Sequence, residues 1–112
     1  MGVQDDWGND PSVQKMRRIF ARMEESQSDL LERLKLSPLD ERLRRVRESA
    51  RNLFEQVWPQ AQRTGMTQNE DDAANLYLHC FVKMLNAERI KVPTDLFPSD
   101  DKILRFLGKE SR

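Results

Sequence analysis

The sequence predicts an all-α protein, an antiparallel up-and-down bundle of three long helices plus a short C-terminal helix. Apolar residues recur at spacings of three and four along successive stretches, which is the period of an amphipathic helix. Proline or glycine separates these stretches. The hydrophobic content of 38% and charged content of 34% suit helices that each leave one face in water.

The 112 residues are expected to form one domain. We place a flexible N-terminal tail at residues 1–11, the helical bundle at 12–108 and a frayed C-terminus at 109–112. The tail is rich in glycine and polar residues and contains one aromatic residue, Trp7. Trp7 either contacts a partner or is exposed or loosely docked, and we favour the second interpretation.

The first long helix should begin near Asp10–Pro11 or Ser12, because these residue types cap helices or occupy their first position. Its apolar seam contains one polar member, Gln27. That residue either sets the register of packing or lies where the seam meets water, and we favour the second. The seam consists of Val13, Met16, Phe20, Met23, Gln27, Leu30 and Leu34.

A break at Leu36-Ser37-Pro38 should end the first helix, with Ser37 capping the second and Pro38 in its first position. So short a connection predicts antiparallel neighbours. The second seam consists of Leu39, Leu43, Val46, Ala50, Leu53 and Val57. Pro59 either ends this helix or kinks it, and we favour a kink because Gly65 has the position of the C-terminal cap.

The most apolar stretch runs from Thr67 to about Ile90 and should form the central helix. Its apolar stripe is wide, which predicts packing against two neighbours. Thr67 and Glu70 have the spacing of a capping box, and Pro93 prevents continuation. A short last helix is expected from a Ser99 cap to Gly108, and it must dock because it is too short to be stable alone.

The composition excludes several classes of function. The formal net charge is zero, which argues against a general nucleic-acid binder. The single cysteine excludes an internal disulfide framework and indicates a reducing cytosol. Residues 1–6 lack the apolar segment of a secretory signal, and no run approaches the roughly 18 apolar residues of a membrane helix. A cytoplasmic protein without membrane contact is therefore expected.

No pattern of catalytic, cofactor-binding or metal-ligating residues is present in the sequence. His79 and Cys80 are adjacent, so they should point roughly 100° apart around a helix. Cys80 falls on the core stripe, whereas His79 falls on the polar side and is expected at the surface. The chain has four glycines, which are too few and too scattered to form a glycine-rich phosphate-binding loop. We therefore expect no enzyme activity and no cofactor.

The most specific polar feature is an arginine run within residues 42–51, in which Arg44, Arg47 and Arg51 share one face. Such a face can bind an acidic partner or a phosphate backbone. The favoured interpretation is a solvated face whose arginines pair along the helix with nearby acidic residues. Those acidic residues are Asp40, Glu41, Glu48 and Glu55.

The C-terminal region carries more apolar surface than a short docking helix needs, which favours contact with another protein or a second copy, as in a homodimer. The expected function is a small cytosolic adaptor, accessory or regulatory protein that acts by protein–protein interaction. The alternative is a nucleic-acid-associated protein that uses the Arg42–Arg51 face. Candidate contact residues are Arg44, Arg47, Arg51, Trp7, Phe97 and Phe106.

Overall fold

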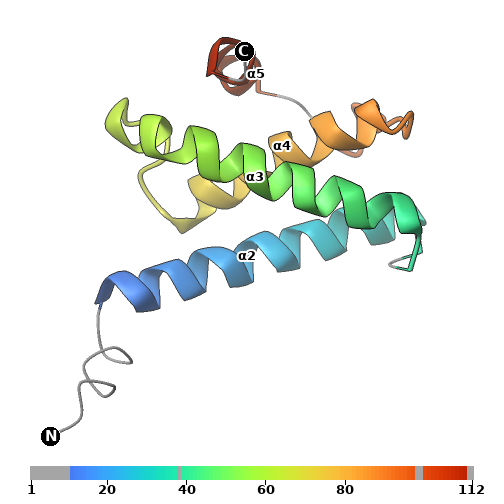
Figure 1. Ribbon diagram of the computed structural model, residues 1–112, viewed down its shortest axis with the longest axis horizontal. Helices are drawn as coiled ribbons and strands as arrows, with labels where there is room; N and C mark the ends of the chain where they lie inside the picture. The colour runs from blue at the N-terminus through green and yellow to red at the C-terminus, as the bar shows by residue number, and fades with distance from the viewer. Residues whose placement is uncertain (1–10, 38, 98–99, 111–112) are drawn as a thin grey trace, which may run out of the picture.

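The computed structural model describes residues 11–37, 39–97 and 100–110. Within these ranges the chain is helical with short connections and contains no strand. The helices are α2 (Pro11–Arg33), α3 (Glu41–Arg63), α4 (Glu70–Ala87) and α5 (Asp101–Glu110). The predicted fold class is confirmed: three long helices pack up and down, and a short helix follows them (Figure 1).

The central helix α4 organises the bundle. It packs along both α2 and α3, which approach each other less closely than either approaches α4. The fourth helix, α5, contacts α4 and runs across the direction of the three long helices (Figure 1). The wide apolar stripe of α4 is thereby explained, since it faces three partners. The helices α2 and α3 therefore do not pack against each other along their length as in a coiled coil.

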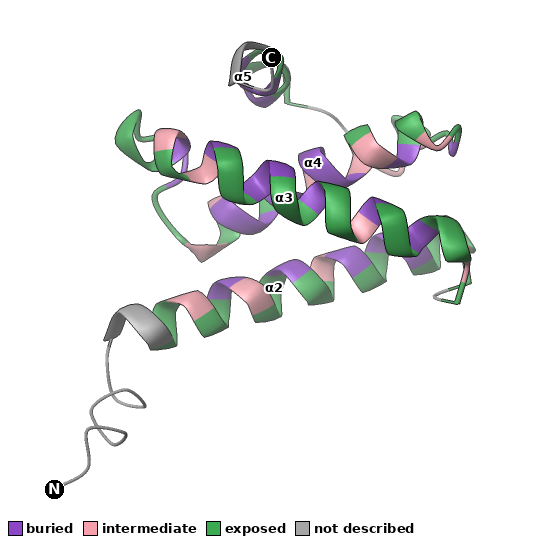
Figure 2. Ribbon diagram, in the orientation of Figure 1, coloured by how far each residue is buried: buried purple, intermediate pink, exposed green. Residues whose placement is uncertain are grey.

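The core lies where the apolar faces of the helices meet, as the buried bands in Figure 2 show. Its largest fully buried side chains come from all four helices. At about 25 cal/mol for each Å² of apolar surface, complete burial of one such side chain contributes roughly 1.5–3 kcal/mol. They include Ile19, Leu43, Phe54, Leu76, Phe81, Leu85 and Leu107.

The connection between α2 and α3 differs from its prediction. The N-cap of α3 is Asp40, not Ser37, and its side chain accepts a hydrogen bond from the Arg42 backbone N–H at 2.9 Å. Ser37 Oγ instead accepts from the Leu39 N–H at 3.2 Å. Leu39, predicted to belong to the apolar seam, is 91% exposed because it precedes the helix. Pro38 lies outside the described residues.

The prediction that α3 continues past Pro59 is confirmed, since the helix extends to Arg63. It ends in a Schellman motif at Gly65, whose φ is +76°. Met66 N–H donates to the Ala61 carbonyl at 2.9 Å, and Gly65 N–H donates to that of Gln62 at 3.2 Å.

The same motif ends α2 and α4 with larger residues in the left-handed position. Lys35 has a φ of 58° after α2, and Arg89 has a φ of 63° after α4. The backbone N–H groups of Leu36 and Ile90 close the two motifs, with donor–acceptor distances of 3.0 and 2.9 Å. The left-handed conformation is costly for residues with a Cβ atom, so both helix ends store strain.

The predicted start of α4 is wrong by two residues. Its N-cap is Asn69, which accepts from the Asp72 N–H at 2.8 Å, and Thr67 does not form the capping box. Thr67 is buried, and its hydroxyl oxygen has no hydrogen-bond partner among the described residues. Asn69 lies closer to the acidic first turn and satisfies a backbone N–H that the helix leaves free.

The short helix α5 continues through Gly108 to Glu110, so the predicted helix end at Gly108 is wrong. Of the predicted frayed C-terminus, residues 109 and 110 are helical, and residues 111–112 lie outside the described residues. At the other end of the chain, Pro11 belongs to α2 and not to a tail. The predicted cap Ser99 lies outside the described residues. In the described parts of the chain, no helix combines the length and hydropathy needed to cross a membrane.

Candidate functional site

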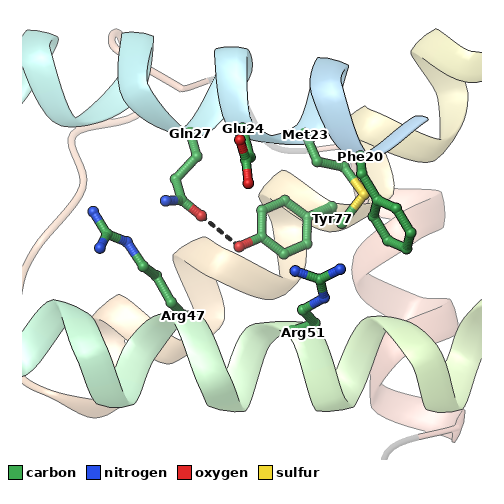
Figure 3. A pocket seen from close by; sticks show the side chains of 7 residues that line it. All are labelled: Phe20, Met23, Glu24, Gln27, Arg47, Arg51 and Tyr77. Atoms are coloured by element: carbon green, nitrogen blue, oxygen red, sulfur yellow. Dashed lines mark hydrogen bonds between the residues drawn. The ribbon is translucent and has the colours of Figure 1, made fainter. Parts of the chain in front are cut away.

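The main candidate site is a cleft between α2 and α3 whose floor is Tyr77 of α4 (Figure 3). We call it the arginine cleft. It encloses a cavity of about 100 Å³. Three helices therefore contribute to one small cavity, whose lining combines apolar side chains with polar and charged ones. The lining residues are Phe20, Met23, Glu24, Gln27, Arg47, Arg51 and Tyr77.

The floor of the cleft is held by a buried polar pair. The Tyr77 hydroxyl group donates a hydrogen bond to Oε1 of Gln27 (Figure 3). Gln27 is 8% exposed, so the prediction that it lies where the seam meets water is wrong. Its carbonyl oxygen is taken by Tyr77, which leaves the amide nitrogen to donate on the side of the cleft where Arg47 lies.

Arg51 is positioned by an aromatic ring and a carboxylate. Its guanidinium carbon lies 4.5 Å from the centroid of the Phe20 ring, which is a cation–π contact between α3 and α2. Its Nε lies 3.7 Å from a carboxylate oxygen of Glu55, one turn further along α3. These contacts hold a positive charge at the edge of the cleft.

Arg47 is only partly exposed, and its Nε is buried without a hydrogen-bond partner in the described parts of the chain. A buried donor without an acceptor costs about 1–3 kcal/mol, and more when the group is charged. Glu24, the carboxylate that lines the same cleft, is exposed and forms no ion pair with Arg47 or Arg51 among the described residues. This Nε is therefore covered by protein atoms and offers no hydrogen bond to a molecule in the cleft.

Burial controls ionisation around the central helix. It raises the pKa of Tyr77 to about 12, although Arg51 and Arg47 act in the opposite direction. Burial also raises the pKa of the Cys80 thiol to about 12. Both side chains are therefore neutral near pH 7. Cys80 is buried, as predicted, and a neutral buried thiol is a poor nucleophile.

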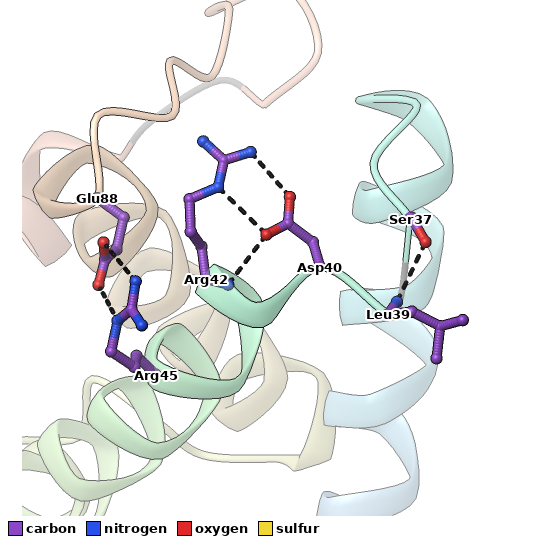
Figure 4. A network of polar contacts seen from close by, with 6 residues as sticks. All are labelled: Ser37, Leu39, Asp40, Arg42, Arg45 and Glu88. Carbon is purple, nitrogen blue, oxygen red and sulfur yellow. Dashed lines mark hydrogen bonds and ion pairs between the residues drawn. The ribbon is translucent and has the colours of Figure 1, made fainter.

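The remaining arginines of α3 have other partners. Arg42 forms an ion pair with Asp40 at 2.8 Å, and Arg45 forms one with Glu88 after α4 at 2.9 Å (Figure 4). Hydrogen bonds from these arginines lower the pKa values of both carboxyl groups. Of the predicted face, Arg47 and Arg51 reach the cleft, whereas Arg44 is exposed and does not line it.

A second candidate site is a groove of about 350 Å³ between α4 and α5, which we call the α4/α5 groove. Leu104, 45% exposed, forms part of its wall. The volume is that of a small-ligand or side-chain pocket. Its lining residues are His79, Val82, Lys83, Asn86, Phe97, Leu104, Leu107 and Gly108.

His79 fastens the C-terminal segment to α4. It is 2% exposed, so the predicted surface position is wrong. Its Nε2 accepts a hydrogen bond from the Asp100 N–H at 3.0 Å. Its Nδ1 lies 2.8 Å from the Asn75 carbonyl oxygen and must therefore carry the proton. The Phe97 ring packs edge-on against the imidazole, with ring centroids 4.8 Å apart.

The predicted contact residues thus lie in different parts of the structure. Phe97 is half-buried in the α4/α5 groove, whereas Phe106 is buried in the core and contributes little surface. Trp7 lies outside the described residues. Sequence reasoning missed Tyr77 and His79 as parts of these sites. The tyrosine in the apolar stripe could have indicated the first site, because a buried tyrosine hydroxyl group usually has a hydrogen-bond partner.

Comparisons of the chain with protein-family models, with curated proteins and with solved structures each find no match. The functional argument therefore depends on the two sites themselves.

Proposed function

We propose that the protein is a non-catalytic helical adaptor, accessory or regulatory protein that binds another protein through the α4/α5 groove. The observation that carries this proposal is the apolar lining of the groove beside a half-exposed Leu104. A contiguous apolar hollow on a protein surface, rimmed by polar residues, is typical of sites that receive a partner's side chains.

The size and charge of the groove favour one kind of occupant. A volume of about 350 Å³ accommodates one or two large apolar side chains but not a whole helix. Lys83 is the charged residue in the lining of the groove. The partner we propose is a helix with apolar anchor residues and an acidic residue beside them, because such a helix complements both the hollow and the Lys83 ammonium group.

The chemistry of the described residues favours binding over catalysis. The thiol of Cys80 is buried, and burial keeps it protonated at neutral pH. The imidazole of His79 uses both ring nitrogens in hydrogen bonds to the backbone. A nucleophile and a base that share an open site are what acyl or phosphoryl transfer requires, and these two residues do not supply them.

The test compares Leu104→Glu with Arg105→Glu. Both residues are exposed on α5. Arg105→Glu changes the net charge more than Leu104→Glu does, so it shows whether a loss of binding is caused by the added negative charge alone. Affinity purification from the native cell should recover a protein with the wild type and with Arg105→Glu, but not with Leu104→Glu. The recovered protein should then be purified and its affinity for each variant measured. We expect it to bind the wild type and Arg105→Glu with similar affinity and Leu104→Glu more weakly. Identical recovery with all three baits would contradict the proposal.

Self-association is a separate outcome of the same variants. Sedimentation of the purified chain at high micromolar concentration distinguishes a second copy from another protein as the occupant. A dimer that Leu104→Glu dissociates would make the partner a second copy. A monomer in every variant, together with no recovered partner, would count against an interaction role.

The alternative, a nucleic-acid-associated protein, has weaker support. Arg42, Arg45 and Arg51 all have carboxylate partners, so the basic character of that face is largely neutralised. Reversing the charge at Arg44 and Arg47 separates the two functions. It should abolish a salt-sensitive shift of duplex DNA or RNA if the alternative holds, and it should leave partner binding at the α4/α5 groove unchanged.

A further inference from the structure

The C-terminal segment, which comprises Phe97 and residues 100–110, competes with a proton for one atom of His79. The ring accepts the Asp100 N–H through Nε2 at 3.0 Å, and its Nδ1 lies 2.8 Å from the Asn75 carbonyl oxygen. A carbonyl oxygen only accepts, so Nδ1 carries the one proton of the neutral ring and Nε2 presents its lone pair. A second proton, on Nε2, would place two donors face to face. Protonation therefore requires the bond to Asp100 to break.

The surroundings of His79 do not compensate a positive charge on the ring. The residue is 2% exposed, and the Phe97 ring packs against the imidazole with centroids 4.8 Å apart. This cover removes the water that would solvate an imidazolium ion. None of the ion pairs in the described parts of the chain involves His79. A charged ring is therefore stabilised by leaving the interface and meeting water.

His79 is the only histidine of the chain, which isolates its effect to a narrow range of pH. The connection between α4 and α5 contributes the charged residues Lys91 and Asp95, which are exposed. The charged side chains that line the α4/α5 groove or the adjoining pocket around Asn75 are Asp72, Lys83, Asp100 and Lys102. Carboxyl groups ordinarily titrate near pH 4 and lysines near pH 10. Between pH 5 and 7 the imidazole is thus the side chain expected to change its charge.

One wall of the α4/α5 groove belongs to the segment that this bond fastens. Phe97, Leu104 and Leu107 line the groove from the C-terminal segment, and α4 supplies the opposite wall. In the described parts of the chain, α5 packs closely against α4 and not against α2 or α3. Release of the segment from α4 would therefore take the groove apart and leave the three long helices in contact.

We propose that protonation of His79 releases the C-terminal segment from α4 and so dismantles the α4/α5 groove as the pH falls from 7 to 5. The docked ring holds one proton, and the released ring holds two at acid pH. The released state thus binds more protons, and a fall in pH favours it. The release does not depend on what the groove binds, whereas the loss of a bound protein at acid pH rests on the function proposed above.

The size of the effect has a ceiling. A free imidazole titrates near pH 6.5, so the ratio of released to docked chains rises by up to about 25-fold between pH 7 and pH 5.

Amide hydrogen exchange of the full chain at pH 7, 6 and 5 measures the release. Exchange itself depends on pH, so each rate is divided by that of an unstructured chain at the same pH to give an opening constant. We expect the opening constants of the Asp100 amide and of the slowest amides of α5 to rise about tenfold or more from pH 7 to pH 5. Those of α2 and α3 should stay constant. The ¹⁵N signals of the ring report the protonation of His79 in the same samples.

Two variants separate the imidazole from the carboxylates. His79→Gln keeps an acceptor for the Asp100 N–H but does not titrate, so its α5 opening constants should change less than about twofold from pH 7 to pH 5. Asn75→Ala leaves the backbone oxygen that holds Nδ1 and should keep the pH dependence of the wild type.

Three results would overturn the proposal. The first is a change of less than about threefold in the wild-type opening constants of α5. The second is the wild-type pH dependence in His79→Gln, which would assign the release to carboxylates. The third needs no variant: a ring that gains its second proton while α5 stays protected.

The effect on binding is measured separately. A protein recovered through the α4/α5 groove should bind the wild type more weakly at pH 5 than at pH 7 and should bind His79→Gln equally at both. Release of α5 without any loss of binding would show that the recovered protein does not use the groove. That result would contradict the proposed function and would leave the release of the segment established.

Discussion

The Tyr77 hydroxyl group donates a hydrogen bond to the side-chain carbonyl oxygen of Gln27, and this bond joins the central helix to the first helix. Both residues are buried. A buried polar group needs a partner, because water no longer satisfies it. The pair therefore allows two polar side chains to lie in an otherwise apolar interface, and it also forms the base of the arginine cleft.

Replacing Tyr77 by phenylalanine should lower the free energy of unfolding by about 1–3 kcal/mol, because Gln27 then keeps a buried carbonyl oxygen without a donor. Gln27→Leu should cost a similar amount. The double variant Gln27→Leu/Tyr77→Phe should be more stable than the sum of the single losses predicts. Urea unfolding of the four proteins measures this coupling, and strictly additive losses would show that the bond contributes nothing.

The arrangement of the long helices was predictable because local patterns determine it. Helical periodicity identified the faces that become buried in α3, and the short connection at residues 34–40 required the chain to reverse. The wide stripe of α4 indicated several neighbours. The errors at Ser37 and Thr67 have one cause: several adjacent residues were able to cap, and the choice among them depends on how the preceding loop packs.

The positions of Gln27 and His79 were not predictable from periodicity alone. Gln27 is buried because a tyrosine on another helix offers it a partner. His79 projects away from the face that packs on α2 and α3, and it is buried only because the C-terminal segment covers it. Both depend on contacts between residues far apart in the sequence. The arginine face was visible as a pattern, but only the packing shows that Arg47 and Arg51 reach the cleft and Arg44 does not.

Alkaline pH should destabilise the protein through Tyr77. Burial raises its pKa to about 12, whereas an unfolded tyrosine ionises near pH 10. Between these values the folded chain keeps a proton that the unfolded chain has lost, so the free energy of unfolding falls as pH rises. Between pH 10 and 12 the wild type should lose up to about 1.4 kcal/mol per pH unit more than Tyr77→Phe does. Cys80 is present in both proteins, so its contribution to the difference cancels. Parallel curves of unfolding free energy against pH for the wild type and Tyr77→Phe would contradict the prediction.

Two glycine substitutions should have opposite effects. Gly65 has a φ of +76°, and an added Cβ would meet only Gln68 Nε2 at 3.8 Å, so the cost of Gly65→Ala is backbone strain of about 1 kcal/mol. Gly108 lies inside α5, with open space around an added Cβ. Gly108→Ala should therefore raise stability by about 0.5–1 kcal/mol. Thermal unfolding compares them, and a loss in both variants would contradict the helical assignment of Gly108.

The reverse substitution should relieve strain at the end of α4. Arg89 has a φ of 63° in the position that glycine usually occupies in this motif. Arg89→Gly should stabilise the protein by about 0.5–1 kcal/mol. This is the left-handed backbone strain that glycine removes, minus the conformational entropy that glycine loses on folding. Arg89→Ala is the control, because it removes the side chain but keeps the Cβ atom. Equal stability of the two variants would show that the backbone carries no strain there.

The bond between His79 and Asp100 should decide whether α5 stays docked. His79→Leu keeps an apolar side chain of similar bulk but removes the acceptor of the Asp100 N–H, which lies immediately before α5. We expect the amide protons of α5 to exchange with solvent at least tenfold faster, while those of α2 and α3 keep their rates. The reason is that, in the described parts of the chain, α5 packs closely against α4 and not against α2 or α3. Asn75→Ala is the matched control: only the backbone oxygen of Asn75 contacts the imidazole, so its side chain is dispensable. Unchanged exchange in α5 would mean that apolar burial of Ile103 and Leu107 holds the helix without the histidine.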